Sequence, residues 1–207
     1  MIDLSSIIGF SLVAFMMVLS PGPNMIYLIS RSICQGKKAG YISLLGVGVG
    51  FVFYMMLASL GLTAILFSKP YIYDIIKFLG VFYLLWLAWN AIKVGGSSAF
   101  EVKNLAFDSN LKLFSMGLLT NLLNPKIAIM YMSLLPQFID SNKNIFIQSI
   151  FLGTIQIVIS LTVNSLIVLF SGSIAIFLSK NPVAARIQRY LMGGVLIFLA
   201  IQVLLNP

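Results

Sequence analysis

The amino-acid sequence predicts an all-α protein that crosses a lipid bilayer several times, and three observations lead to this fold class. Hydrophobic residues make up 60% of the 207 residues and charged residues only 9%, against about a quarter charged in an ordinary soluble domain. The apolar residues form six stretches long enough for a helix to cross a bilayer. Prolines interrupt the first and fourth stretches, where a helix must break. We therefore expect a polytopic membrane protein of six transmembrane helices, with helices 1 and 4 broken.

The six predicted spans leave little of the chain outside the bilayer. A bilayer core of about 30 Å takes roughly 20 helical residues. The spans are predicted at Leu4–Ser30, Tyr41–Leu66, Tyr71–Ile92, Leu113–Phe138, Ile145–Ser171 and Tyr190–Leu205. The first is not expected to be a cleaved signal peptide, because it lacks a basic beginning and ends in prolines rather than small residues.

The basic residues lie mainly in alternate connections between these spans. Nine of the thirteen Lys and Arg residues follow spans one, three and five, three lie on the other face, and Lys126 lies within span four. The positive-inside rule then puts the odd-numbered connections in the cytoplasm and both termini outside. Because topology accounts for the net charge of +8, we expect the lipid bilayer and no nucleic acid as a partner.

The longest polar interval, from Lys93 to Asn110, divides the chain into two sets of three spans. We predict a first half at 1–94, a cytoplasmic connection at 95–110 and a second half at 111–207. Because three is odd, the second half enters the membrane from the opposite side, as in the inverted repeats of secondary transporters. The repeat is supported by "FSLVAFMMVLSPGPNMIYLI" in span one and "FSMGLLTNLLNPKIAIMYM" in span four, which both run from Phe-Ser into a proline break.

The two proline breaks predict a binding site at the depth of the bilayer core. A proline cannot donate a hydrogen bond to the carbonyl four residues earlier. We therefore expect free acceptors at Met17, Leu19 and Asn121. Broken backbone at this depth is tolerated where it lines a cavity or is buried in protein, and transporters bind substrates at such breaks.

The break in span four also carries a lysine. Asn124 and Pro125 are a helix-start pair, with a side-chain cap followed by proline at the first helical position. Lys126 then lies in the first turn, where the positive end of the helix dipole and the lysine together favour an anion. From Leu113 to Lys126 is 13 residues, about 20 Å of helix and past the bilayer midplane. The alternative is that this lysine extends along its stem to an interface.

Span five carries a polar stripe, because Gln156, Ser160 and Asn164 recur every four residues and share one helix face. The stripe lies along a transport pathway or holds helices together, and the pattern alone leaves both interpretations open. In span two, Gly46 and Gly50 allow a close helix approach, within the chain or, as the alternative, in a homodimer.

Several kinds of chemistry lack the residues they need. The sequence has no histidine and a single cysteine, Cys34, and its five acidic residues all fall in connections or at span ends. We therefore expect no metal site, no cofactor and no redox pair. A membrane-embedded enzyme would need a nucleophile or an acid/base pair in the spans, and none is visible. The protein is expected not to be an enzyme.

Five segments of the chain, in order, resemble the LysE/RhtB-type family of amino-acid exporters. They are "SPGPN" from Ser20, "QGKKAGYISLLGVGVG" from Gln35, "KFLGVFYLLWLAWNAIK" from Lys77, "LLNPKIAIMYMSLLPQF" from Leu122 and "RIQRYLMGGVLI" from Arg186. The resemblance covers nearly the whole chain. It implies a protein of the bacterial inner membrane that exports amino acids and is coupled to the proton gradient.

The resemblance also implies that both breaks line the pathway, through Pro21, Gly22, Pro23, Asn24, Asn124, Pro125 and Lys126. Together with the flanking Ser20 and Asn121 and the stripe Gln156, Ser160 and Asn164, these are the predicted substrate-binding residues. Many members of the family have aspartate where this chain has Asn24. Asparagine cannot ionise, which makes Lys126 the candidate proton carrier, because desolvation can lower the pKa of a buried lysine.

From these residues we expect a secondary carrier of small neutral amino acids that works by alternating access. The substrate carboxylate would meet Lys126, and its ammonium would meet freed carbonyls near Pro21 and Asn24. A cationic side chain would need a carboxylate that the spans lack. The polar stripe favours threonine or homoserine first, with aliphatic side chains next. The alternatives are an exporter of basic amino acids or of another small metabolite, a passive channel, and a metal-ion transporter.

Overall fold

The computed structural model describes residues 2–20, 22–68, 70–93 and 107–205, and all regular secondary structure in these ranges is helical. The elements in chain order are α1 (Leu4–Leu19), α2 (Pro23–Gln35), α3 (Lys37–Ser68), α4 (Pro70–Ile92), α5 (Asn110–Leu122), α6 (Pro125–Ile129), the π-helical turn η1 (Met130–Leu134), the 3-10 turn η2 (Leu135–Phe138), α7 (Ile145–Lys180) and α8 (Pro182–Leu205). Most of the connection predicted at 95–110 lies outside the described residues.

The predicted breaks in the first and fourth apolar stretches are confirmed. α1 and α2 meet at an angle of 52°, and α5 meets the helical run Pro125–Phe138 at 49°. Each new helix starts with proline at its first position, Pro23 after Gly22 and Pro125 after Asn124. The side chain of Asn124 accepts a hydrogen bond from the Lys126 N–H, as its predicted role as a cap requires.

Within the described residues, two continuous helical segments are long and apolar enough to cross a membrane, Lys37–Gly61 and Ile145–Ser173. Each bent pair is also long and apolar enough when its two helices are taken as one span, which gives up to four candidate spans. α4 and α8 contain the shorter apolar stretches Phe78–Asn90 and Gly193–Leu205. Six spans in two inverted halves therefore stay a prediction, whereas an all-helical membrane protein with bent helix pairs is confirmed.

The connection predicted between Ser30 and Tyr41 is mostly helical. α2 continues to Gln35 and α3 starts at Lys37. Only Gly36 separates the two helices, and its φ of 86° is a conformation that favours glycine. The helices extend beyond their apolar stretches because backbone hydrogen bonding does not depend on side-chain polarity.

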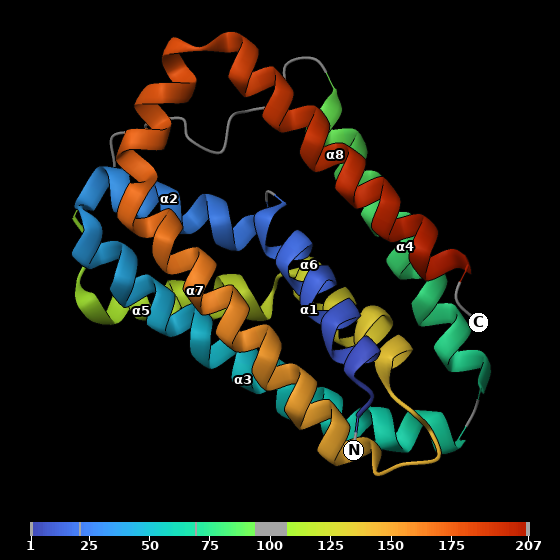
Figure 1. Cartoon of the computed structure of the whole chain (residues 1–207). Helices are drawn as coiled ribbons and strands as arrows, with labels where there is room; N and C mark the ends of the chain where they lie inside the picture. The colour runs from blue at the N-terminus through green and yellow to red at the C-terminus, as the bar shows by residue number, and fades with distance from the viewer. Residues whose placement is uncertain (1, 21, 69, 94–106, 206–207) are drawn as a thin grey trace.

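The helices pack in two main groups (Figure 1). α3 lies against α5 and α7, and α4 lies beside α8. Gly46 and Gly50 of α3 face Phe114 and Asn121 of α5, so these glycines pack within the chain. Many large apolar side chains point outward, including Phe82 and Leu123. An apolar outer surface of this kind is suited to lipid.

Ion pairs connect segments that are distant in the sequence. Arg31 of α2 pairs with Asp108, just before α5. Lys143, in the connection before α7, pairs with Asp3 at 3.4 Å and with Asp140 at 3.1 Å. A backbone hydrogen bond from Asn142 and contact with Lys143 lower the pKa of the Asp140 carboxyl. The connections after predicted spans one and three therefore meet, and the N-terminus meets the connection after span four.

Candidate functional site

A small cavity lies between the two helix breaks and α7. Its volume is about 30 Å³, enough for about one or two water molecules. It is lined by Gly22 and the polar Asn24 from the first break, by Asn124 and Lys126 from the second, and by Gln156, Ser160 and Asn164 from α7. Seven of the predicted substrate-binding residues, from three segments of the chain, are thus brought together around one cavity.

Lys126 connects the two breaks. Its side chain starts on α6, is 5% exposed, and donates from Nζ to the backbone carbonyl of Ser20 at the end of α1. A cation is favourable there because the carbonyl end of a helix carries partial negative charge. The alternative in which this lysine extends to an interface does not fit its burial. A Cβ on Gly22 would lie 3.1 Å from Lys126 Cδ, so the lysine stem runs directly past this glycine.

The prediction that the prolines leave free carbonyls is wrong for two of its three acceptors. The hydroxyl of Ser20 donates to the Met17 carbonyl at 3.0 Å. The carbonyl of Asn121 accepts from the backbone N–H of Asn124 at 3.0 Å. Local groups replace the missing proline donors because an unpaired carbonyl in a dry interior is costly. At the break between α1 and α2, the carbonyl that binds a cation is that of Ser20, and the cation is the Lys126 ammonium.

The polar stripe of α7 lies in the cavity wall and is internally hydrogen-bonded. Gln156 Nε2 donates to Ser160 Oγ at 2.7 Å, and Asn164 Nδ2 donates to the Ser160 carbonyl at 2.8 Å. The Gln156 side-chain oxygen accepts from the hydroxyl of Tyr131 at 2.6 Å. The stripe therefore lines the cavity and also joins α7 to η1, whereas its place along a transport pathway stays a prediction.

Two buried amides lack hydrogen-bond partners among the described residues. Both side-chain atoms of Asn24, which lines the cavity, are unpaired, and so are those of Asn121. The two side chains are 6% and 0% exposed. Buried polar groups without partners are rare and costly. Asn24 is therefore available to a polar ligand in the cavity, whereas Asn121 lies against Gly50 and is not among the lining residues.

The remaining predicted residues act on the site indirectly. Ser20 contributes its carbonyl and hydroxyl to the neighbouring backbone and to Lys126. The side chains of Pro23 and Pro125 are exposed, so these residues break the helices without lining the cavity. Pro21 lies outside the described residues.

The apolar part of the wall was not predicted. Seven side chains supply it: Ala14, Met17, Val18, Met25, Phe51, Ile127 and Met130. Behind it, the rings of Tyr54 and Tyr131 stack with centroids 6.0 Å apart, and the Tyr54 hydroxyl donates to the Leu122 carbonyl at 2.8 Å. No sequence signal marks these residues, because apolar and aromatic side chains are common throughout the spans.

The wall of the cavity combines one cationic side chain with amide, hydroxyl and apolar groups. Among the described lining residues the charged one is the cation Lys126, and none is a carboxylate. The described residues contain no group of His, Cys, Asp or Glu that could hold a metal ion. Amide and hydroxyl groups and apolar side chains both contribute to the lining.

The sequence is similar to that of known membrane translocators. The LysE type translocator family matches residues 15–207. A leucine efflux protein from Enterobacter sp. (strain 638) is 31% identical over 188 residues, 87% of this chain and 86% of that protein. The uncharacterized membrane protein YrhP from Bacillus subtilis (strain 168) is 31% identical over 158 residues, 72% of this chain and 75% of that protein. A leucine efflux protein from Salmonella typhimurium is 27% identical over 181 residues, 87% of this chain and 85% of that protein. No solved structure has significant similarity to the chain.

Proposed function

The chain belongs to the LysE type translocator family, and on that premise we propose that it exports small neutral amino acids across the bacterial inner membrane. It is a multi-pass membrane protein and a transporter rather than an enzyme. The export of amino acids in general is supported by the relatives that are named leucine efflux proteins. The proposed mechanism is that of a secondary carrier with alternating access, in which Lys126 also carries the coupled proton.

The observation that carries the proposal is the buried ammonium of Lys126 between two broken helices. It lies at the start of α6, where the first backbone N–H groups already bond to Asn124, so the ammonium itself is the group that attracts an anion. The carboxylate of an amino acid is an anion of suitable size for this position. Because none of the described lining residues is a carboxylate, a lysine or arginine side chain would find no counter-charge in the cavity and would be repelled by Lys126.

The contact between Lys126 and the Ser20 carbonyl indicates how a zwitterion would be held. In the structure the lysine ammonium donates to that carbonyl. When the substrate carboxylate binds Lys126, the substrate ammonium donates to the Ser20 carbonyl in place of the lysine. Each charge then keeps a partner throughout the exchange, which avoids the cost of a buried unpaired ion. The unpaired amide of Asn24 supplies a further hydrogen bond to the substrate.

The rest of the wall favours an aliphatic side chain over a hydroxylated one. The amide nitrogens of Gln156 and Asn164 already donate to Ser160, which leaves the stripe with fewer donors for threonine or homoserine than its sequence suggests. Met17, Phe51 and Met130 offer apolar contacts in the same lining. We therefore propose leucine-like substrates first, in agreement with the names of the relatives.

The cavity must widen to admit any of these substrates. Its volume of about 30 Å³ is well below the roughly 300 Å³ at the lower end of ligand pockets. Alternating access would supply the wider states, each open to one side of the membrane. A passive channel is the alternative, and counterflow separates the two, because only a carrier exchanges substrate faster when substrate is present on the other side.

We expect the exporter to rescue cells from toxic concentrations of a dipeptide that contains leucine. Hydrolysis of the dipeptide fills the cytoplasm with the free amino acid, and a cell that exports it keeps growing. Rescue should be strongest for leucine, weaker for threonine and serine, and absent for lysine and arginine. Cells with the empty vector are the control. Rescue by lysine or arginine peptides alone would contradict the neutral class.

The membrane orientation has a separate test. Both termini are proposed to be outside and the connection around Gly36 inside, because nine of the twelve basic residues outside the core lie on that side. In a Cys34→Ser background, an impermeant thiol reagent applied to intact cells should label Asn142→Cys and spare Lys38→Cys. The reverse pattern would mean that the orientation is inverted.

A further inference from the structure

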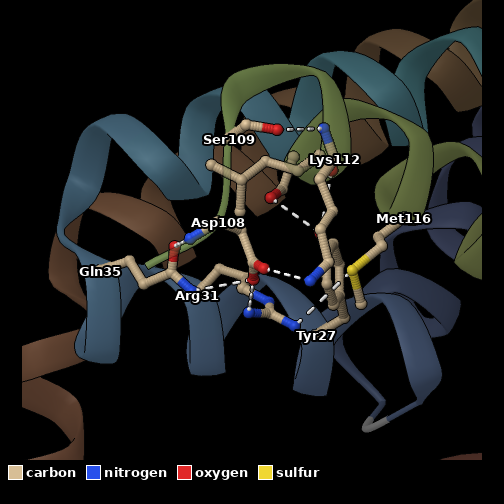
Figure 2. Close-up of polar contacts among 9 residues, drawn as sticks. Tyr27, Arg31, Gln35, Asp108, Ser109, Lys112 and Met116 are labelled. Carbon is tan, nitrogen blue, oxygen red and sulfur yellow. Dashed lines mark hydrogen bonds and ion pairs between the residues drawn. The ribbon is translucent and has the colours of Figure 1, made fainter. Parts of the chain in front are cut away.

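An ion pair joins α2 to Asp108, two residues before α5 (Figure 2), and neither partner lines the cavity. Arg31 Nη1 donates to Asp108 Oδ2, and the two side chains are 11% and 8% exposed. Gln35, one turn further along α2, donates from Nε2 to the same oxygen at 3.1 Å. The side-chain oxygen of Gln35 accepts from the Asp108 N–H at 3.0 Å. α2 therefore holds both the carboxylate and the backbone of Asp108.

Tyr27 extends the contact toward the cavity. Its hydroxyl donates to the Leu113 carbonyl of α5 at 2.9 Å and accepts from the Ser43 hydroxyl at 3.1 Å. The Arg31 guanidinium lies 5.3 Å from the centre of the Tyr27 ring, within the range of a cation–π interaction. We call Tyr27, Arg31, Gln35 and Asp108 the clasp.

The three α2 residues of the clasp lie on the same face of α2 as the cavity residue Asn24. Asn24, Tyr27, Arg31 and Gln35 are spaced by three, four and four residues, which places them on the same side of the helix. Asn24 lines the cavity, and Arg31 lies seven residues further along, about 10 Å of helix. The α2 residues of the clasp therefore lie between Asn24 and the end of α2 at Gln35, on the face that carries Asn24.

Asp108 has a second basic partner that does not connect the helices. Lys112, on α5 itself, contacts Asp108 Oδ1 at 2.6 Å and is 61% exposed. Hydrogen bonds from Lys112 and Gln35 lower the pKa of the Asp108 carboxyl. The carboxylate therefore keeps its charge at neutral pH. On the other side of the pair, Arg31 Nε is buried without a hydrogen-bond partner among the described residues, and it is available to another acceptor.

We propose that the Arg31–Asp108 pair closes the site at the α2–α3 end, and that a zwitterionic amino acid opens it by replacing each partner in turn. The substrate carboxylate binds Arg31, first at its unpaired Nε, and the substrate ammonium binds the Asp108 carboxylate. Neither ion is left buried without a partner during the exchange. The pair is thus an entry site for the same substrate that Lys126 later binds. This inference rests on the proposed function for the identity of the zwitterion.

A thiol reporter in the cavity tests the gate. In a Cys34→Ser background, Val18→Cys puts a thiol of similar size into the lining. The protein is reconstituted in vesicles, and an impermeant thiol reagent is applied on the side of the α2–α3 connection. Asp108→Asn and Arg31→Gln should each speed labelling at least about tenfold, as expected for the loss of one charge-assisted hydrogen bond between the helices. Leucine should speed labelling in the parent and have little further effect in Asp108→Asn.

The matched control is Lys112→Met, which removes an ion pair to the same carboxylate within one helix and should leave the labelling rate unchanged. The double variant with Arg31→Asp and Asp108→Arg should return the rate to within about twofold of the parent, since the attraction is restored with its signs exchanged. If the single variants label fast and the charge exchange does not restore slow labelling, the gate is overturned, because the fast labelling then reflects loosened packing. Unchanged labelling in Asp108→Asn would also overturn it.

Leucine counterflow in the parent vesicles separates this inference from the proposed function. Labelling needs no transport, so the variants report on the gate even where leucine is not carried. A parent that shows no counterflow and no response of labelling to any amino acid contradicts the proposed function and the opening by a zwitterion. A parent that carries leucine while Asp108→Asn labels slowly contradicts the gate alone.

Discussion

Replacement of Lys126 with methionine is expected to reduce transport at least about tenfold, because the loss of one charge-assisted hydrogen bond costs about 1.5 to 3 kcal/mol. Methionine keeps most of the apolar stem and removes the ammonium. The Ser20 carbonyl, which holds that ammonium, is then left buried without its partner, and the substrate carboxylate loses its cation. Initial rates of leucine counterflow in vesicles measure the effect.

Lys126→Arg should retain more activity than Lys126→Met, because it keeps the charge, although its planar head matches the position of the ammonium imperfectly. Lys38→Met is the matched control, since it removes an exposed lysine of α3 and should transport at the parent rate. All three variants are compared at equal amounts of inserted protein. Parent-level transport by Lys126→Met would remove this residue from the site and from its proposed role as proton carrier.

The parts of the site that could be predicted are those set by local rules. Proline within an apolar stretch breaks a helix wherever the chain folds, and Asn124 before Pro125 caps the next helix for the same local reason. The depth of Lys126 follows from counting helical rise. The shared face of Gln156, Ser160 and Asn164 follows from helical periodicity. Apart from Pro125, these residues line one cavity in the structure.

The parts that could not be predicted depend on partners far away in the sequence. Arg31 and Asp108 are 77 residues apart, and nothing near either residue indicates the other. The same holds for Tyr131 and Gln156. Local reasoning also failed where it assumed that a carbonyl released by proline stays free, because Ser20 supplies a new donor to Met17. Burial in a dry interior selects whichever donor is within reach.

The close approach of α3 and α5 gives the prediction with the largest expected effect on folding. A Cβ on Gly46 would lie 2.0 Å from the backbone oxygen of Phe114, and one on Gly117 would lie 2.2 Å from the backbone oxygen of Ser43. Neither backbone oxygen can move aside as a side chain could. Even Gly46→Ala or Gly117→Ala must therefore separate the helices, at a cost of about 1–3 kcal/mol or more per site.

Because Gly50, one turn further along α3, packs on Asn121 beside the second helix break, the separation should also disturb the site itself. The fraction of monodisperse protein that survives heating in detergent measures the loss of stability, and it should fall for Gly46→Ala and Gly117→Ala. Gly61→Ala is the matched control, since it lies on α3 with nothing within 4 Å of its added Cβ and gains helix propensity. If Gly46→Ala and Gly61→Ala survive heating equally well, α3 and α5 do not approach as closely as the structure shows.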